Sequence, residues 1–161
     1  KVKTTAKPNT SGVVVEGIDN CMVRFSHCCN PVPGDKIVGY VTRGRGVAVH
    51  RADCLNMIHA AASEQERNRL ISVHWAGDTP PSSFQSMITI TASDRVNLLV
   101  DILTVINDAK APVTNVNART GRNDLAIIEI TTEISNTSQL DTIKRKLKAL
   151  SGVISVSRSR Q

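Results

Sequence analysis

Two kinds of hydrophobic pattern alternate along the chain, one typical of strands and one typical of helices. Runs of Val, Ile and Leu that alternate with polar residues predict strands, whereas apolar residues three or four positions apart predict helices. The predicted strands span residues 13–16, 21–26, 36–41, 47–50, 70–75, 87–92, 113–119, 125–134 and 153–157. Helices are predicted over residues 54–62 and 95–109, and a third begins near Ser138 and ends at Gly152. This mixture predicts an α+β fold.

Cap residues and apolar faces define the three helices. Asp53 is the expected N-cap of the first helix, Ser93 or Asp94 that of the second, and residues 138–141 resemble a capping box before the third. The apolar face of the first helix comprises Leu55, Ile58 and Ala62. The second and third helices have longer apolar faces, formed by Leu98, Leu99, Ile102, Leu103 and Ile106 and by Leu140, Ile143, Leu147 and Leu150.

Stretches rich in Pro, Gly and Ser divide the chain into domains. Residues 1–12 are expected to be a flexible lead-in, and residues 76–86, which contain a Pro pair, a hydrated linker. Between them, residues 13–75 form a small α+β module built around a β-hairpin. Residues 87–161 follow the order β-α-β-β-α-β, which is the ferredoxin-like arrangement.

The stretch from Cys28 to Cys54 contains a candidate metal site. Two apolar strands joined by the glycine-containing tip 42–46 predict a hairpin. Cys28, Cys29 and Cys54 flank this hairpin, and His50 ends its second strand. Thiolates and an imidazole are ligands that suit Zn²⁺. The alternative is that these residues are small apolar groups in a tight core.

Charge and composition bear on nucleic-acid binding. The chain of 161 residues has a formal net charge of +6 and only 2% aromatic residues. Residues 1–77 hold ten Lys/Arg and six Asp/Glu, so an excess of +4 lies in the first half. A basic excess permits a nucleic-acid partner, and the scarcity of aromatic residues favours backbone contacts over base stacking.

The candidate phosphate-binding residues are Arg43 and Arg45 at the hairpin tip, with Arg24, Lys36 and Arg51 extending the patch. The alternative is a solvated turn that charge keeps soluble. The run Lys144-Arg145-Lys146-x-Lys148 on the last helix has the same two alternatives, a solvated face or an RNA contact.

The sequence has no apolar run of 18 or more residues and no signal-peptide pattern, so we expect a cytoplasmic protein without a membrane partner. Cysteines in that compartment are free thiols or ligands more often than disulfides, and Cys21 is expected in the core. No Ser-His-carboxylate set, Walker loop or acidic pair on one helix is found. We therefore expect no catalytic residues in this chain.

Motifs in both halves resemble one known family. The first half reads CC-x-P-x-PGD at 28–35, IVG at 37–39, G-x-GV at 44–47 and VHR-x-DC at 49–54. It resembles the conserved-cysteine, zinc-finger-like or ribosome-intersubunit, module of long RelA/SpoT-type guanosine tetraphosphate synthetases. The second half reads A-x-DR-x-x-LL-x-DI at 92–102 and resembles the ACT domain that ends those proteins.

The resemblance implies a non-catalytic regulatory fragment of a stringent-response enzyme. The parent enzymes make (p)ppGpp from ATP and GTP or GDP as GTP pyrophosphokinases, and many also hydrolyse it. Their catalytic domains lie upstream of this region. In the family this region docks on the ribosome near deacylated tRNA, contacts large-subunit RNA and restrains the catalytic half.

The resemblance also implies a candidate amino-acid site, because ACT domains of some members bind branched-chain amino acids. The candidate residues are Asp94, Arg95, Asn97, Leu98 and Leu99 at the strand-to-helix turn, with Val113, Asn115 and Val116 from a neighbouring copy in a homodimer through the ACT sheet. Many relatives have Gly where Asn97 stands, which counts against binding. The alternative is an N-cap with no ligand.

Overall fold

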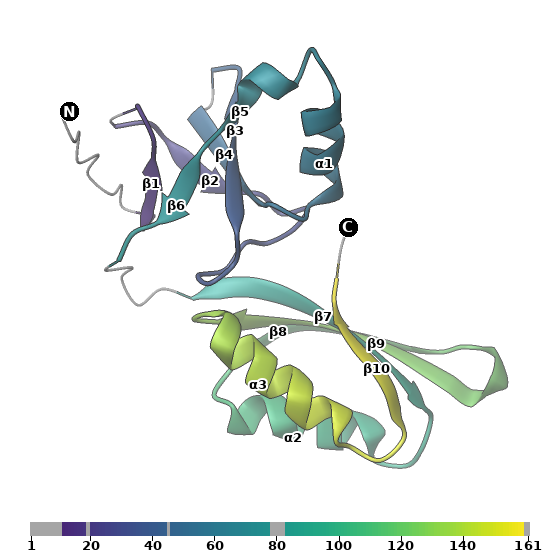
Figure 1. Cartoon of the computed structure of the whole chain (residues 1–161). Coiled ribbons are helices and arrows are strands. Elements are labelled where there is room, and N and C mark those ends of the chain that lie inside the picture. The colour runs from purple at the N-terminus through teal and green to yellow at the C-terminus, as the bar shows by residue number, and fades with distance from the viewer. Residues whose placement is uncertain (1–10, 19, 45, 78–82, 160–161) are drawn as a thin grey trace. The chain divides into compact units, whose positions relative to one another are not determined.

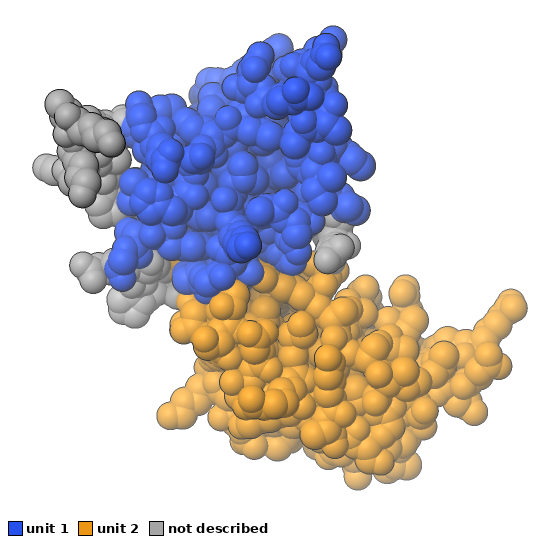
Figure 2. Space-filling view, viewed as in Figure 1, with its two compact units in different colours: residues 1–82, 160–161 blue, residues 83–159 orange. Residues whose placement is uncertain are grey.

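The computed structural model describes residues 11–18, 20–44, 46–77 and 83–159, and it divides the chain into two compact units. The first unit consists of residues 1–82 with 160–161, and the second of residues 83–159 (Figure 2). Each unit has buried apolar residues of its own.

The first unit combines two β-sheets with one α-helix (Figure 1). Its elements are β1 (Val13–Val15), β2 (Val23–Phe25), β3 (Ile37–Thr42), β4 (Gly46–Arg51), α1 (Leu55–Ala62), the 3-10 helix η1 (Arg67–Arg69), β5 (Leu70–Ile71) and β6 (Val73–Trp75). The four-stranded sheet has the order β2-β4-β3-β5, and β1 pairs with β6 in a separate two-stranded sheet. Within the larger sheet only the β2–β4 pair is parallel.

The two faces of the four-stranded sheet belong to different hydrophobic clusters. Val47 and Val49 on β4 pack with Val13, Val15 and Val73 of the two-stranded sheet. Val38 and Tyr40 on β3 instead pack with Met57 and Ala60 of α1 and with three of the cysteines. Successive side chains of a strand point to opposite faces, so the hairpin β3–β4 forms the centre of this unit.

Three predictions for the first unit were wrong. Cys54, not Asp53, is the N-cap of α1, because the Asp53 carboxylate pairs with the Arg51 guanidinium at 2.7 Å. The buried face of α1 is formed by Met57 and Ala60, whereas Leu55 and Ile58 are about half exposed and Ala62 is exposed. The single strand expected at 70–75 is divided at Ser72, and its two parts join different sheets.

The second unit confirms the predicted β-α-β-β-α-β order. Its elements are β7 (Phe84–Ser93), α2 (Leu98–Asp108), β8 (Val113–Thr120), the 3-10 helix η2 (Arg122–Asp124), β9 (Leu125–Ile134), α3 (Thr137–Lys148) and β10 (Val153–Arg158). The sheet is antiparallel with the order β10-β7-β9-β8, and both helices lie on one face of it (Figure 1).

Alternation along the two central strands explains this layering. Every second residue of β7 and β9 is buried, including Ile88, Ile90, Ile128 and Ile130, and these side chains meet the apolar faces of α2 and α3. The edge strand β8 is different, because all eight of its residues are exposed. The element order and the four-stranded sheet confirm the α+β fold class. β8 pairs with β9 on one side, and no described strand of this unit pairs with its other side.

The element boundaries of the second unit differ from the predictions in three places. β7 begins at Phe84, three residues before the predicted strand, since Phe84 and Ser86 continue its buried alternation. α2 begins only at Leu98, because its N-cap Asn97 has a left-handed backbone with φ of 65°. The N-cap of α3 is Asn136 rather than Ser138, and its side chain accepts a hydrogen bond from the Gln139 N–H at 2.9 Å.

Among the described residues, no helix is both long enough and apolar enough to cross a membrane.

Candidate functional site

Three separate chain segments bring the predicted thiol and imidazole groups together in the first unit. Cys28 and Cys29 lie in the turn after β2, His50 lies on β4, and Cys54 begins α1. The turn is closed by the Asn30 N–H, which donates to the Ser26 carbonyl at 3.0 Å, and Asn30 has a left-handed φ of 45°. The four potential ligand atoms all lie within 4.8 Å of one another.

The distances within this thiol–imidazole cluster fit a tetrahedral metal ion. Cys28 Sγ lies 3.7 Å from Cys54 Sγ, and His50 Nδ1 lies 3.4 Å from Cys28 Sγ and 3.8 Å from Cys29 Sγ. With Zn–S of about 2.3 Å and Zn–N of about 2.0 Å, the edges of a tetrahedron are about 3.8 Å between sulfurs and about 3.5 Å between sulfur and nitrogen. The other three distances among these four atoms are at most 4.8 Å, so the cluster can hold a metal ion after small shifts of its side chains.

Burial affects the protonation of the cluster in the absence of a metal. It raises the pKa of the Cys29 thiol to about 12 and also raises the pKa of the Cys28 thiol. It lowers the pKa of His50, and the positive charge of Arg24 lowers this pKa further. A neutral imidazole is the form that ligates metals, whereas the thiols must release their protons when a metal binds.

The predicted phosphate-binding residues are not all brought together. Arg43 lies exposed directly after β3, and Arg24 is exposed on the edge strand β2, whereas Arg45 lies outside the described residues. Lys36 lies at the opposite end of the six-residue strand β3, about 20 Å from the tip. Arg51 is 92% buried and ion-paired with Asp53, so its inclusion in an exposed patch was wrong.

The glycines of the hairpin tip have distinct structural roles. Gly44 has a φ of 73°, and a Cβ atom there would meet nothing within 4 Å. Gly46 has a φ of 80°, and a Cβ atom there would lie 2.1 Å from the Met22 carbonyl oxygen. That carbonyl accepts the Val47 N–H at 2.8 Å, which joins the chain before β2 to the hairpin.

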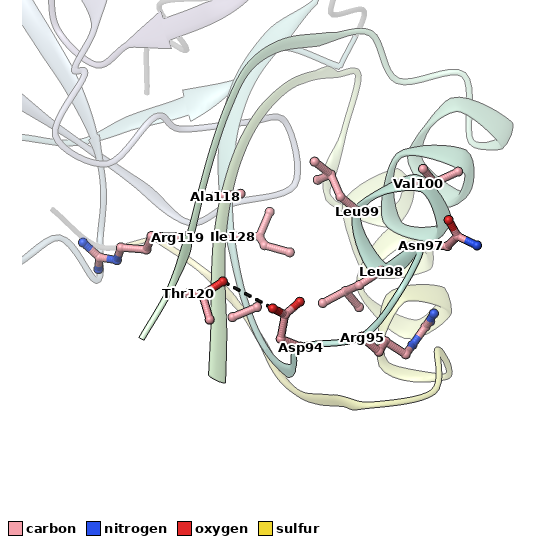
Figure 3. Close-up of a pocket in the computed structure, with 11 residues that line it drawn as sticks. Asp94, Arg95, Asn97, Leu98, Leu99, Val100, Ala118, Arg119, Thr120 and Ile128 are labelled. Atoms are coloured by element: carbon pink, nitrogen blue, oxygen red, sulfur yellow. Dashed lines mark hydrogen bonds between the residues drawn. The ribbon is translucent and has the colours of Figure 1, made fainter. Parts of the chain in front are cut away.

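A second candidate site is a pocket of about 300 Å³ between α2 and the strands β8 and β9 (Figure 3). Leu98, Ala126 and Ile128 give it an apolar lining, and the Asp94 carboxylate accepts a hydrogen bond from the Thr120 hydroxyl at 3.4 Å. The Leu98 N–H donates to the Arg95 carbonyl at 3.3 Å, and Asn97 makes no side-chain cap, so an anionic group would meet the N–H groups that follow Leu98 in the first turn of α2. The pocket thus combines a carboxylate, a helix N-terminus and apolar walls.

Arg95 and Asn97 are among the residues that line this pocket, but the polar ends of their side chains point away from it (Figure 3). The Arg95 guanidinium binds Asp101 at 2.8 Å, and its Nε donates to the Ser151 carbonyl at 2.8 Å. The Asn97 amide is exposed on the outer side of α2. The left-handed backbone at Asn97 is a conformation that Gly adopts without strain, so Gly would suit this position for a reason independent of space for a ligand.

The predicted strand residues line a different pocket. Val113 and Val116 contact a second hollow together with Leu103, Asn107 and Pro112, at the far end of α2. Asn115 lines neither pocket. Within one copy of the chain, these three residues therefore do not join the turn at Asp94.

Sequence reasoning missed Ser26, Ala118 and Thr120. Ser26 Oγ lies 2.8 Å from His50 Nε2, and Ala118 and Thr120 line the pocket beside Asp94. The signal for Ser26 is the parallel register of β2 with β4, in which Phe25 pairs with Val49. That pairing is non-local and is not visible in hydrophobic periodicity.

Comparison with known proteins matches the two units separately. Residues 13–76 match the model of the RelA/SpoT RIS domain, and residues 80–158 match that of the ACT domain. A solved ACT domain from the GTP pyrophosphokinase of Chlorobium tepidum covers 48% of this chain and 100% of its own, with 22% identity and a TM-score of 0.44.

Full-length relatives match nearly the whole chain. The GTP pyrophosphokinase of Haemophilus influenzae is 40% identical over 154 residues, which is 95% of this chain and 20% of the relative. The GTP pyrophosphokinase of Escherichia coli K12 is 37% identical over 147 residues, which is 91% of this chain and 19% of the relative. The chain spans about a fifth of the length of these relatives. Both matched domains are regulatory, so the chain corresponds to a non-catalytic part of the enzymes in this family. The chain belongs to the RelA/SpoT family and matches its C-terminal regulatory region, a RIS domain followed by an ACT domain.

Proposed function

We propose that this chain docks a (p)ppGpp synthetase/hydrolase on ribosomes that carry deacylated tRNA, contacts large-subunit RNA there, and controls the catalytic domains of the same protein. The observation that carries the proposal is the order of a RIS and an ACT domain over nearly the whole chain. The basic excess of the first half supports a partner rich in phosphate. Relatives with this order are named GTP pyrophosphokinase.

Within this proposal, the tip of the β3–β4 hairpin contacts RNA phosphates. Arg43 and Arg24 are exposed, and the described residues offer neither of them an ion-pair partner. A guanidinium binds phosphate oxygens in a bidentate manner, and a narrow turn at Gly44 lets the tip approach a backbone closely. Contacts of this kind position the module without reading sequence.

Ribosome binding measured over a range of salt concentrations tests this role. Arg43→Glu should weaken binding and lower the slope of log affinity against log salt by about 1. Arg122→Glu, which makes the same charge change at an exposed turn of the ACT unit, is the matched control. Equal affinities and slopes for the two variants would contradict the proposed contact.

We further propose that Cys28, Cys29, His50 and Cys54 hold a structural Zn²⁺ ion. Three thiolates and an imidazole match zinc in type and in number, and they leave no open position for a substrate. The ion would tie the turn after β2 to β4 and to the start of α1. Its role would be to keep the hairpin in a fixed position for docking.

A second candidate function is amino-acid sensing by the ACT unit, supported by the pocket at Asp94. In this arrangement the Asp94 carboxylate binds the ammonium, the N–H groups of α2 bind the carboxylate, and the apolar wall takes a branched side chain. Thermal-shift titration with Val, Leu and Ile tests it, because a ligand at about 100 times its Kd stabilises by about 2.7 kcal/mol. No saturable shift with any of the three would reject this function.

The open edge of β8 supports a further part of the proposal, a homodimer through the ACT sheet. An edge strand with unpaired backbone groups is a template for pairing with another strand. Val113 and Val116 would then lie near a neighbouring copy. Sedimentation of the chain at several concentrations tests this pairing, and a constant monomer mass would exclude it.

A further inference from the structure

The two ring nitrogens of His50 face different chemical groups. Nδ1 points into the thiol–imidazole cluster, at 3.4 Å from Cys28 Sγ and 3.8 Å from Cys29 Sγ. Nε2 lies on the other side of the ring, at 2.8 Å from Ser26 Oγ. His50 is 92% buried, so its surroundings offer little access to water. The partner of each nitrogen is therefore set by the protein.

We propose that Ser26 is a positioning residue for the metal site, which accepts the Nε2–H of His50 and so holds Nδ1 toward the three thiols. The inference rests on the proposed zinc site. A neutral imidazole carries one proton, and only the unprotonated nitrogen can bind a metal. Ligation through Nδ1 therefore requires the proton on Nε2, where a buried N–H needs an acceptor. Ser26 Oγ is at hydrogen-bond distance from that atom.

Backbone contacts fix Ser26 in this place. Its N–H donates to the Val49 carbonyl at 3.0 Å, which continues the parallel pairing of β2 with β4 by one residue. Its carbonyl accepts the Asn30 N–H at 3.0 Å across the turn that carries Cys28 and Cys29. One short segment thus supplies two thiols and also the group that orients the imidazole between them.

Measurement of zinc affinity in the 161-residue chain tests this role by competition with a chelator of known affinity. Ser26→Ala removes the acceptor and should weaken zinc binding about 10- to 100-fold, the range for groups that orient metal ligands. Ser26→Thr keeps a hydroxyl and should restore most of the affinity. Ser72→Ala, at an exposed position between β5 and β6, is the matched control and should bind as the wild type does.

Nitrogen NMR of the His50 ring in the zinc-loaded chain provides a readout that a general loss of stability would not produce. The wild type should show a protonated Nε2 whose hydrogen exchanges slowly, and Ser26→Ala should show fast exchange at the same atom. Circular dichroism at matched zinc saturation would confirm that Ser26→Ala keeps the wild-type fold.

Three outcomes would overturn the inference, and they separate the role of Ser26 from the metal site itself. Zinc binding by Ser26→Ala within twofold of the wild type, or a proton on Nδ1 in the loaded wild type, would overturn the role of Ser26 alone. A wild-type chain that binds no zinc would overturn the metal site itself, and the role of Ser26 with it.

Discussion

At the residue scale, Cys54 combines two roles, because it is the N-cap of α1 and a member of the thiol–imidazole cluster. Its thiol makes no cap hydrogen bond, so the side chain is free for the cluster. Its backbone carbonyl accepts the N–H groups of Met57 and Ile58 at 3.0 Å. A substitution that keeps the cap and removes the thiolate can therefore separate the two roles.

Cys54→Ser is that substitution, since Ser is a favoured N-cap. We expect zinc to be lost and the first unit to be destabilised by about 3 kcal/mol or more, because loss of a metal is among the most costly single changes. Metal analysis and thermal unfolding measure the two effects. Cys21→Ser, a cysteine outside the cluster, should keep the metal; the same metal content in both variants would exclude Cys54 as a ligand.

The two glycines of the hairpin tip give a second prediction. Gly44→Ala should cost about 1–2 kcal/mol, the penalty of a left-handed backbone in open space. Gly46→Ala should cost clearly more, because its Cβ would also meet the Met22 carbonyl and separate β2 from the hairpin. Denaturant unfolding of both variants compares them. Equal losses of stability would show that the close approach of Met22 to Gly46 does not contribute.

Residue type was enough to select the cluster members but not their surroundings. Three Cys and one His around one hairpin suggested a metal site from their residue types, with a tight apolar core as the alternative, whereas Ser26 required the register of a parallel strand pair. Arg51 shows the limit of inference from charge. Its neighbours made it a candidate for an exposed patch, but burial depends on tertiary packing, and the structure places it inside.

At the scale of elements, hydrophobic periodicity was most informative where strands and helices are long. β9 matches its predicted range, since its alternation continues over ten residues. α1 shows the opposite case, because eight residues include several apolar positions and either side could face the sheet. The side that packs is decided by the cysteine turn and β3, which are distant in sequence.

The cap of α3 gives a prediction at this scale. Asn136→Ala should cost about 1 kcal/mol, because its side chain accepts the Gln139 N–H, while Gln139 in turn accepts the Ser135 N–H at 2.8 Å. Ser138→Ala, two residues later in the same turn, should change stability by less than about 0.5 kcal/mol. Chemical unfolding of the ACT unit measures both, and a larger loss for Ser138→Ala would contradict the assigned cap.

At the scale of the whole molecule, the two units have separate cores and separate candidate ligands. The thiol–imidazole cluster belongs to the RIS domain, and the pocket at Asp94 belongs to the ACT domain. The amino-acid pattern predicts both folds, but it carries no information on how one unit signals to the other.

Zinc removal should therefore act on one unit. We expect a strong chelator to increase hydrogen exchange in β4 and α1 and to leave β7 and β9 protected, because the described residues of the ACT domain contain no cluster of candidate metal ligands. Hydrogen-exchange mass spectrometry of the chain before and after chelation measures this. Increased exchange in both units would contradict the independence of their cores.

Equilibrium binding of the zinc-loaded chain to ribosomes, with and without deacylated tRNA, tests whether the chain docks on ribosomes as proposed. We predict saturable binding that depends on the tRNA and weakens steeply with salt, since phosphate contacts release counterions. Binding that is absent, or that is equal without tRNA and insensitive to salt, would show that the chain does not dock on ribosomes in the proposed way.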